Sequence, residues 1–162
     1  MTPGFAIRRA TPGDAATLAG LVVATDRHYG CDLAPDAALA AAEQIVSGTG
    51  RSPFALLAWT ADAEAAGYAT LSPFFPLPGA RWGLYLEELF VLPERRGAGL
   101  GQALLRAAAQ VAREDGYESL FWTTTPDNTG ARALYDRLTG GTSGKVHYEA
   151  QGRQLLDIAG EG

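Results

Sequence analysis

The chain has 162 residues, of which 47% are hydrophobic and 19% charged, so it has the size of one domain and enough apolar side chains to build one core. Its formal net charge of −5 argues against a general nucleic-acid binder, whose footprint is basic. One cysteine excludes an internal disulfide, one cysteine with two histidines does not supply a zinc site, and no apolar run reaches the roughly 20 residues of a membrane span. We therefore expect a cytoplasmic protein without a metal.

The first half of the chain is predicted to contain a strand, two helices and a strand hairpin. Thr11 as N-cap, Pro12 at the first helical position and Asp14 three residues after the cap mark the start of the first helix. The elements expected here run over Phe5 to Arg9, Thr11 to Thr25, Pro35 to Val46, Phe54 to Trp59 and Gly67 to Leu71. A loop rich in proline and aromatic residues should follow, from Ser72 to Trp82.

The second half starts with the strongest strand pattern in the chain. The elements expected are a strand over Leu84 to Leu92, a helix from Leu100 or Gly101 to Asp115, a strand over Glu118 to Thr124, a helix from Asp127 or Asn128 to about Leu138, and a closing hairpin of Val146 to Ala150 with Arg153 to Ile158. Hairpin-linked strands must be antiparallel, whereas strands joined through a helix can be parallel. The prediction is an α+β fold: a mixed, mostly antiparallel sheet of about seven strands with helices on both faces.

A glycine-rich turn lies between the strongest strand and the helix that follows it. Gly97, Gly99 and Gly101 let the backbone approach a ligand closely, and a helix N-terminus adds partial positive charge. Arg95 and Arg96 add two full charges. These features predict a cradle for a phosphate or pyrophosphate, but neither the lysine-bearing P-loop pattern nor the dinucleotide glycine pattern fits. The alternative is a loop that serves only the turn.

The run from Arg96 to Gly101 resembles the Gln/Arg-x-x-Gly-x-Gly/Ala signature of the GNAT acetyltransferase superfamily. Asn128 to Tyr135 is similar to its Asn-x-x-Ala-x-x-Leu-Tyr segment, and Tyr85 to Val91 looks closest to the spermidine/spermine N-acetyltransferase branch. The resemblance spans almost the whole chain. It implies a single GNAT-like domain over 1–162, acetyl-coenzyme A as donor, a small primary amine such as a polyamine as acceptor, direct attack in a ternary complex, and a homodimer that binds neither nucleic acid nor membrane.

The same resemblance assigns the coenzyme-binding residues. The amides of the signature would hold the pyrophosphate, the backbone of the preceding strand would pair with pantetheine, and Asn128 would touch the coenzyme arm. The residues concerned are Leu89, Phe90, Val91, Arg96, Gly97, Ala98, Gly99, Leu100, Gly101 and Asn128.

Glu87 and Glu88 are the candidates for removing a proton from the amine. Alternation would place them on opposite faces of the strand, and a bulge would re-aim one of them. Partial burial would raise the pKa of a carboxyl, as suits a general base. The resemblance favours Glu87 as base and leaves Glu88 to bind or orient the substrate; the alternative for each is a solvated or ion-paired strand residue.

Tyr135 is the candidate general acid, because a phenol stays protonated at neutral pH and can donate to the departing thiolate. The alternative is a core aromatic, since Ala131, Leu134 and Leu138 share its helix face. Trp82 could wall the acceptor pocket or cover the core, and His28 could bind substrate or be solvated. Two other functions stay open: acetylation of a protein or peptide, and a non-catalytic acyl-coenzyme A sensor.

Overall fold

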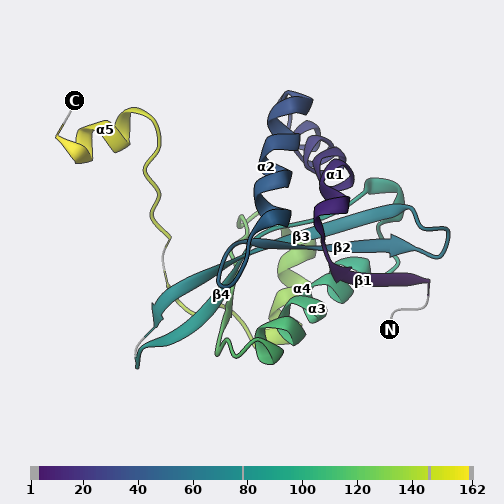
Figure 1. The fold of residues 1–162 in the computed structure, drawn as a ribbon. Helices are drawn as coiled ribbons and strands as arrows, with labels where there is room; N and C mark the ends of the chain where they lie inside the picture. Colours follow the sequence, from purple (N-terminus) through teal and green to yellow (C-terminus); the bar gives the residue numbers. More distant parts are fainter. Residues whose placement is uncertain (1–3, 78, 146, 161–162) are drawn as a thin grey trace. The chain divides into compact units, whose positions relative to one another are not determined.

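The computed structural model describes residues 4–77, 79–145 and 147–160, and the chain divides into two compact units, Met1–Thr123 and Thr124–Gly162 (Figure 1). In its described residues the first unit contains five strands in the sheet order β1-β2-β3-β4-β5. Neighbouring strands are antiparallel except β4 and β5, which are parallel. The strands are β1 (Phe5–Arg9), β2 (Phe54–Thr60), β3 (Ala65–Leu77), β4 (Arg81–Val91) and β5 (Leu120–Phe121).

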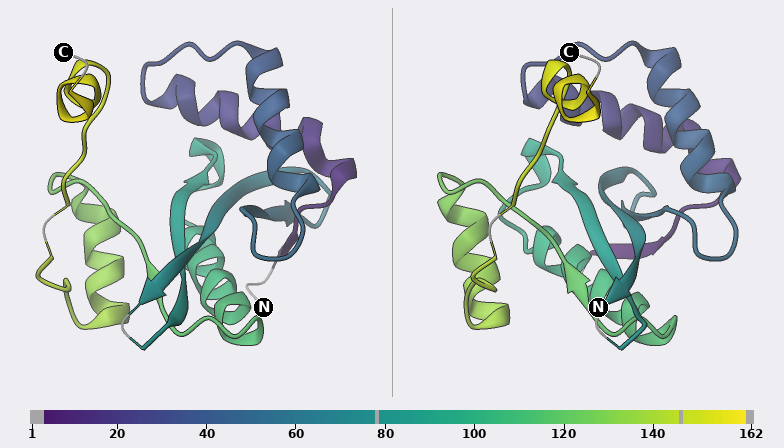
Figure 2. Two further views of the ribbon diagram at one scale, coloured as in Figure 1. Left: turned by 60° about the vertical axis from the view of Figure 1, so that its left-hand side comes forward. Right: turned by 90° about the vertical axis from the view of Figure 1, so that its left-hand side faces the viewer.

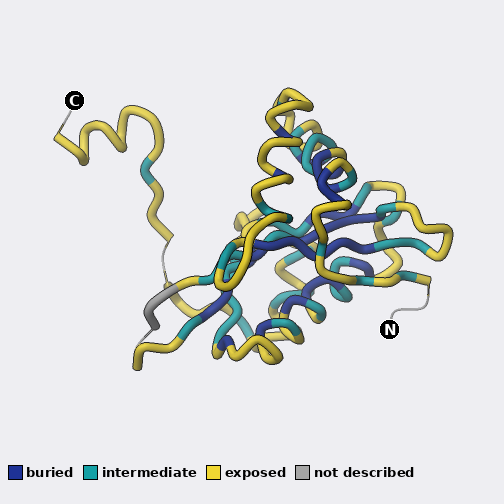
Figure 3. The backbone as a smooth tube through the Cα atoms, in the orientation of Figure 1, coloured by how far each residue is buried: buried dark blue, intermediate teal, exposed yellow. Residues whose placement is uncertain are grey.

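Helices cover both faces of this sheet, as expected. On one side lie α1 (Ala15–His28) and α2 (Pro35–Ser47), and on the other lies α3 (Leu100–Glu114) (Figure 1). Burial is concentrated along the sheet and the helix faces turned toward it (Figure 3). The core on the α1 and α2 side is made of Leu18, Ala19, Leu21, Ala38, Ala42, Ala55, Leu57, Tyr68 and Phe90. The buried side of α3 is made of Leu100, Leu104, Leu105, Ala108 and Ala112.

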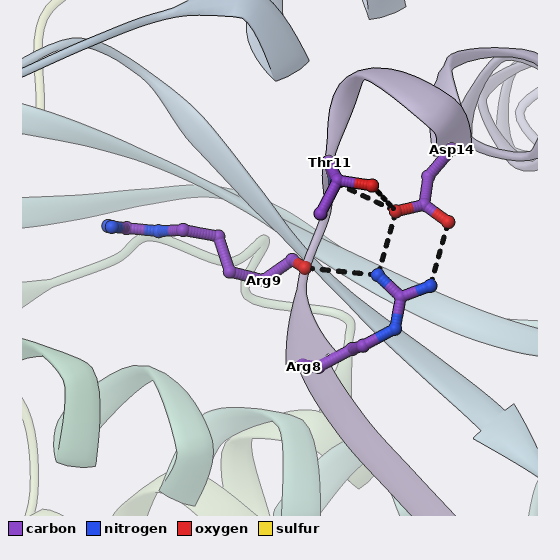
Figure 4. A network of polar contacts seen from close by, with 4 residues as sticks. All are labelled: Arg8, Arg9, Thr11 and Asp14. Carbon is purple, nitrogen blue, oxygen red and sulfur yellow. Dashed lines mark hydrogen bonds and ion pairs between the residues drawn. The ribbon is translucent and has the colours of Figure 1, made fainter.

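The start of α1 is fixed by a polar network around Asp14, which is only 7% exposed (Figure 4). The Asp14 carboxylate accepts hydrogen bonds from the backbone amide and the hydroxyl of Thr11, each at 2.7 Å. It also accepts two from the Arg8 guanidinium, at 2.7 and 2.8 Å. These contacts hold the pKa of Asp14 well below its usual range, with the hydrogen bonds from Arg8 as the largest cause. The network joins β1 to a short 3-10 helix over Pro12–Asp14, which leads directly into α1. Thr11 is the N-cap, as predicted, although the α-helix itself begins at Ala15.

The hairpin of β3 and β4 is longer than the sequence pattern indicates (Figure 2). We expected a loop over Ser72 to Trp82, but β3 continues to Leu77 and β4 begins at Arg81. The pairing of β2 ends at Leu71, so no described residue pairs with the rest of β3 on that side. Proline is tolerated on such an edge because it removes no ladder hydrogen bond, and Pro73 therefore fits within the strand.

The expected count of seven strands is wrong for the described residues. Arg153 to Ile158 was expected to be a strand but forms the helix α5 (Arg153–Ala159), and no strand forms over residues 147–150, while position 146 lies outside the described residues. Leucine, glutamine and alanine are good helix formers. An Arg153–Asp157 ion pair at i,i+4 spacing and a left-handed Gly160 after the last turn support the helix. The second unit also contains α4 (Thr129–Thr139), close to its predicted bounds.

Candidate functional site

The register of β4 changes at the two glutamates. Leu89 faces Ala69 and Glu88 faces Thr70, but the next residue of β3, Leu71, faces Leu86. Glu87 is therefore the extra residue of a β-bulge, at the position where the sequence raised that possibility. The bulge separates the environments of the two carboxylates: Glu87 is exposed and Glu88 is half-buried.

Glu88 lies among tyrosines on the side of the sheet that carries α1. Burial raises the pKa of the Glu88 carboxyl, and an interaction with the backbone amide of Leu89 acts in the opposite direction. Burial, followed by the charge of Glu88, raises the pKa of Tyr29. Burial raises the pKa of Tyr68 to about 12, and its hydroxyl lies 3.0 Å from that of Thr25 in α1. A half-buried carboxyl with a raised pKa suits the transfer of a proton near neutral pH.

One edge of β4 is open beside these residues. In the described part of the chain β5 pairs with β4 only at Leu84 and Tyr85. The amide of Leu92 donates to the Ala66 carbonyl in the direction of β3. Because peptide groups alternate in direction along an antiparallel strand, those of Leu89 and Val91 point away from β3, toward the open edge. An extended ligand could therefore add to this edge as a further strand.

The glycine-rich turn presents a row of backbone donors. The amide of Ala103 donates to the Gly99 carbonyl, at 3.0 Å, but no described residue accepts a hydrogen bond from the amides of residues 97 to 102. Gly97 and Gly99 have φ values of +83° and +79°, which side chains rarely adopt, and a Cβ at either would meet nothing within 4 Å. These amides lie at the N-terminus of α3, where a helix carries partial positive charge and could attract an anion.

Both arginines of the turn bind protein groups. Arg95 forms an ion pair of 2.6 Å with Glu64, in the turn between β2 and β3. The Arg96 guanidinium donates from Nε to the Val91 carbonyl at 2.9 Å, and its amide, which we expected in the cradle, donates to the Pro93 carbonyl. The main-chain amides of residues 97 to 102, by contrast, have no partner among the described residues.

His28 lies beside Arg96 at the end of α1. The Arg96 guanidinium contacts Nε2 of His28 at 3.4 Å, and its Cζ lies 5.5 Å from the centre of the Phe90 ring. The His28 ring also packs on Phe90, with the ring centres 5.7 Å apart. The structure thus brings His28, Phe90 and Arg96 together.

Trp82 lies near the start of β4, several residues before Glu87. The guanidinium of Arg51 stacks over its ring at 4.6 Å and over that of Tyr117 at 5.0 Å. Asn128 and Tyr135 belong to the second unit, where the Asn128 side chain accepts a hydrogen bond from the amide of Ala131 and caps α4. Tyr135 is half-buried in that helix.

Sequence reasoning missed Tyr29 and Tyr68 as neighbours of Glu88. Tyr68 faces Phe90 across the β3–β4 ladder, two residues from the pair of Thr70 with Glu88. Aligning the two strands as a hairpin would have shown that Tyr68 shares a sheet face with Glu88. Tyr29 follows the last residue of α1, and the sequence offers no signal for its place near β4.

The described residues contain neither a cluster of three or more His, Cys, Asp or Glu side chains able to hold a metal ion nor a helix long and apolar enough to cross a bilayer. What they do contain is a row of backbone amides without a protein partner, an open strand edge and a half-buried carboxyl, all near the end of β4. This combination can hold a phosphorylated, extended ligand and remove a proton beside it.

Comparison with known proteins agrees with this geometry. A model of the acetyltransferase (GNAT) family matches residues 18–140. Streptothricin acetyltransferase from Streptomyces lavendulae is 36% identical over 80 residues, which cover 48% of this chain and 39% of that protein. The chain spans between a third and half of the length of the curated relatives it matches.

Solved structures share the fold over nearly the full length. An integron cassette protein from the mobile metagenome of V. cholerae is 23% identical with a TM-score of 0.82, and 98% of each chain is covered. An aminoglycoside N-acetyltransferase solved in complex with CoA is also 23% identical, with a TM-score of 0.74, over 91% of this chain and 94% of that chain.

Proposed function

The chain belongs to the acetyltransferase (GNAT) family. From that premise we propose that it transfers an acetyl group from acetyl-coenzyme A to the primary amine of a small molecule. The amine would attack the thioester directly in a ternary complex. The observation that carries the proposal is the row of amides at residues 97 to 102, without partners among the described residues, beside the open edge of β4.

The described residues fit the coenzyme. Its diphosphate needs several donors that converge, and the turn supplies them with partial positive charge from α3. Gly97 and Gly99 leave open the space that a Cβ would fill. The peptide groups of Leu89 and Val91 point toward the edge where the pantetheine amides would add as a strand. The Val91 carbonyl already accepts a hydrogen bond from Arg96 and the Leu89 amide interacts with Glu88, so the Leu89 carbonyl and the Val91 amide are the groups proposed to pair with pantetheine. The bound coenzyme supplies an acetyl thioester, and the protein's part is to hold it and to move protons.

We assign the base to Glu88, with Glu87 as the alternative that resemblance to polyamine acetyltransferases favours. The acceptor amine is protonated in water and must lose a proton before its nitrogen can attack. The carboxyl with the raised pKa is Glu88, and burial is the cause. Glu87, in the exposed position of the bulge, is accessible to water and can bind a second positive charge on the acceptor.

Two residues of the second unit keep the roles that the resemblance implies for them. Tyr135 is proposed to donate its phenolic proton to the sulfur that leaves the acetyl group, and Asn128 to contact the coenzyme arm. We also propose that the two units act as one acetyltransferase domain and that the protein is a homodimer. Trp82, held by Arg51, borders the start of β4 and is proposed to limit the acceptor site from that end.

The acceptor is proposed to be a small cationic amine. The streptothricin and aminoglycoside enzymes act on such compounds by name. Calorimetric titration with CoA tests the coenzyme site, and release of free thiol from acetyl-CoA tests transfer to spermidine, an aminoglycoside, lysine and a peptide with a free N-terminus. Transfer to the peptide alone would refute a small acceptor. Binding of CoA without transfer to any amine would indicate a sensor, and no binding would refute the whole proposal.

A further inference from the structure

We propose that His28 is a positioning residue for the coenzyme site, which acts by holding Arg96 on the carbonyl of Val91. The inference rests on the proposed function of the glycine-rich turn. It gives His28 a role in binding the acetyl donor, in place of the contact with the acetyl acceptor that was considered from the sequence. The cluster formed by His28, Phe90, Val91 and Arg96 is called the Arg96 cluster below.

The Arg96 cluster joins two parts of the proposed coenzyme site. Val91 ends the open edge of β4, and Arg96 precedes the first free amide of the turn. The bond of 2.9 Å from Arg96 Nε to the Val91 carbonyl ties the two parts directly. A ligand that uses both the strand edge and the amides binds more tightly when their spacing is fixed beforehand.

His28 supports this bond from a rigid element. The last turn of α1 is pinned to β3 by the buried contact between the hydroxyls of Thr25 and Tyr68, at 3.0 Å. His28 follows three residues later and packs its ring on Phe90, on which the Arg96 guanidinium also lies. The guanidinium is therefore held by the Phe90 ring, the Val91 carbonyl and Nε2 of His28.

The chemistry of the contact fixes the charge state in which it forms. A guanidinium only donates hydrogen bonds, so Nε2 of His28 must accept, and the ring proton must lie on Nδ1. A protonated imidazole has no acceptor and would place a second positive charge against Arg96. Tyr29, the residue that follows α1, packs edge-on against the His28 ring, and the charge of Glu88 on β4 acts on Tyr29. Protonation of His28 should therefore release Arg96.

The test compares His28→Ala, His28→Gln and a matched control, His147→Gln, which makes the same change at an exposed histidine of the second unit. Calorimetry with CoA should show affinity reduced roughly three- to tenfold by His28→Ala, the range expected for one hydrogen bond and its packing. Glutamine places a neutral acceptor near the position of Nε2, so His28→Gln should recover most of the affinity. The control should bind CoA as the wild type does. In turnover, His28→Ala should raise KM for acetyl-CoA and leave kcat within about twofold.

A pH series separates positioning from a general structural effect. Wild-type affinity for CoA should fall more steeply as the pH is lowered than that of His28→Gln, because glutamine keeps its neutral acceptor at every pH. The difference between the two proteins removes any titration of CoA itself, and this arm remains informative even if His28→Ala does not fold.

Three results would overturn the inference. Unchanged CoA affinity in folded His28→Ala, or parallel pH profiles of the wild type and His28→Gln, would show that the imidazole does not support the site. A rise in the acceptor's KM with an unchanged KM for acetyl-CoA would place His28 at the acceptor. Wild-type protein that does not bind CoA would overturn the proposed function as well, whereas the first two results leave that function intact.

Discussion

Adding one methyl group to the glycine-rich turn should separate coenzyme binding from stability. Gly99 has φ of +79°, and a Cβ there would meet nothing within 4 Å. Gly99→Ala therefore clashes with no atom of the free protein and costs only the backbone strain of a left-handed residue, about 1 kcal/mol. Gly116 at the far end of α3 is a matched control, because its φ is +74° and its surroundings are equally open. Gly116→Ala should cost about the same.

The two variants should differ only with the coenzyme. A methyl group on Gly99 fills space that a diphosphate on the adjacent amides would need. Loss of one or two charge-assisted hydrogen bonds costs about 1.5–3 kcal/mol, which is roughly a 10- to 150-fold rise in the Kd for CoA. Urea unfolding measures the common stability loss, and calorimetry with CoA measures the difference. Equal CoA affinity in the two variants, whether wild-type or equally reduced, would refute the assignment of residues 97 to 102 as the anion site.

Three further changes test the other assignments. Glu88→Gln should lower kcat by roughly 100-fold, and more than Glu87→Gln does; equal losses would remove the reason to prefer the buried carboxyl. Because the pKa of Glu88 is raised, the ionised carboxylate destabilises the folded state. Glu88→Gln should therefore be more stable than the wild type near neutral pH. This gain in stability should disappear when the pH falls below the ordinary pKa of a glutamate. Asp14→Ala should lower the unfolding free energy by about 2–3 kcal/mol. Because the pKa of Asp14 is lowered in the folded state, this contribution is present above about pH 4 and fades as the pH falls further. Urea unfolding at several pH values that shows no such trend would contradict the network with Arg8. Tyr135→Phe should lower kcat with little change in CoA affinity, and full turnover in a thiol-release assay would exclude the phenol as the acid.

The features predicted well from the sequence depend on neighbours along the chain. The start of α1 follows from Thr11 and Asp14, whose contact spans three residues. The buried side of α3 follows from its apolar spacing, and the turn before it from glycines that only a left-handed backbone explains. In each case the interactions that fix the conformation join residues only a few positions apart, so they can be predicted from a single sequence.

The features predicted poorly depend on partners far along the chain. The sequence could not show that β2 stops pairing at Leu71, so the prolines that follow looked like a loop. The sequence suggested a closing hairpin around Gly152, yet no strand forms over residues 147 to 160. Without an edge to pair with, local helix propensity decides the structure of Arg153–Ala159.

The arginines show the same limit at the candidate site. Their position beside the glycines indicates charge for a phosphate, but a sequence does not reveal which partner each charge takes. Glu64 binds Arg95 across a strand turn, and the Val91 carbonyl binds Arg96. Each arginine thus ties the turn to a neighbouring part of the sheet, and the main-chain amides are the donors proposed for the anion.

The choice between the two glutamates also depends on strand register. On a regular strand, adjacent residues point to opposite faces, and both faces of this sheet carry helices, so neither carboxylate would be easily solvated. The bulge leaves Glu87 exposed and only Glu88 half-buried. The bulge thus avoids the desolvation of one carboxylate and leaves the other half-buried on the face of the sheet that carries α1. A base with a raised pKa requires such a cost, and the bulge limits the cost to one residue.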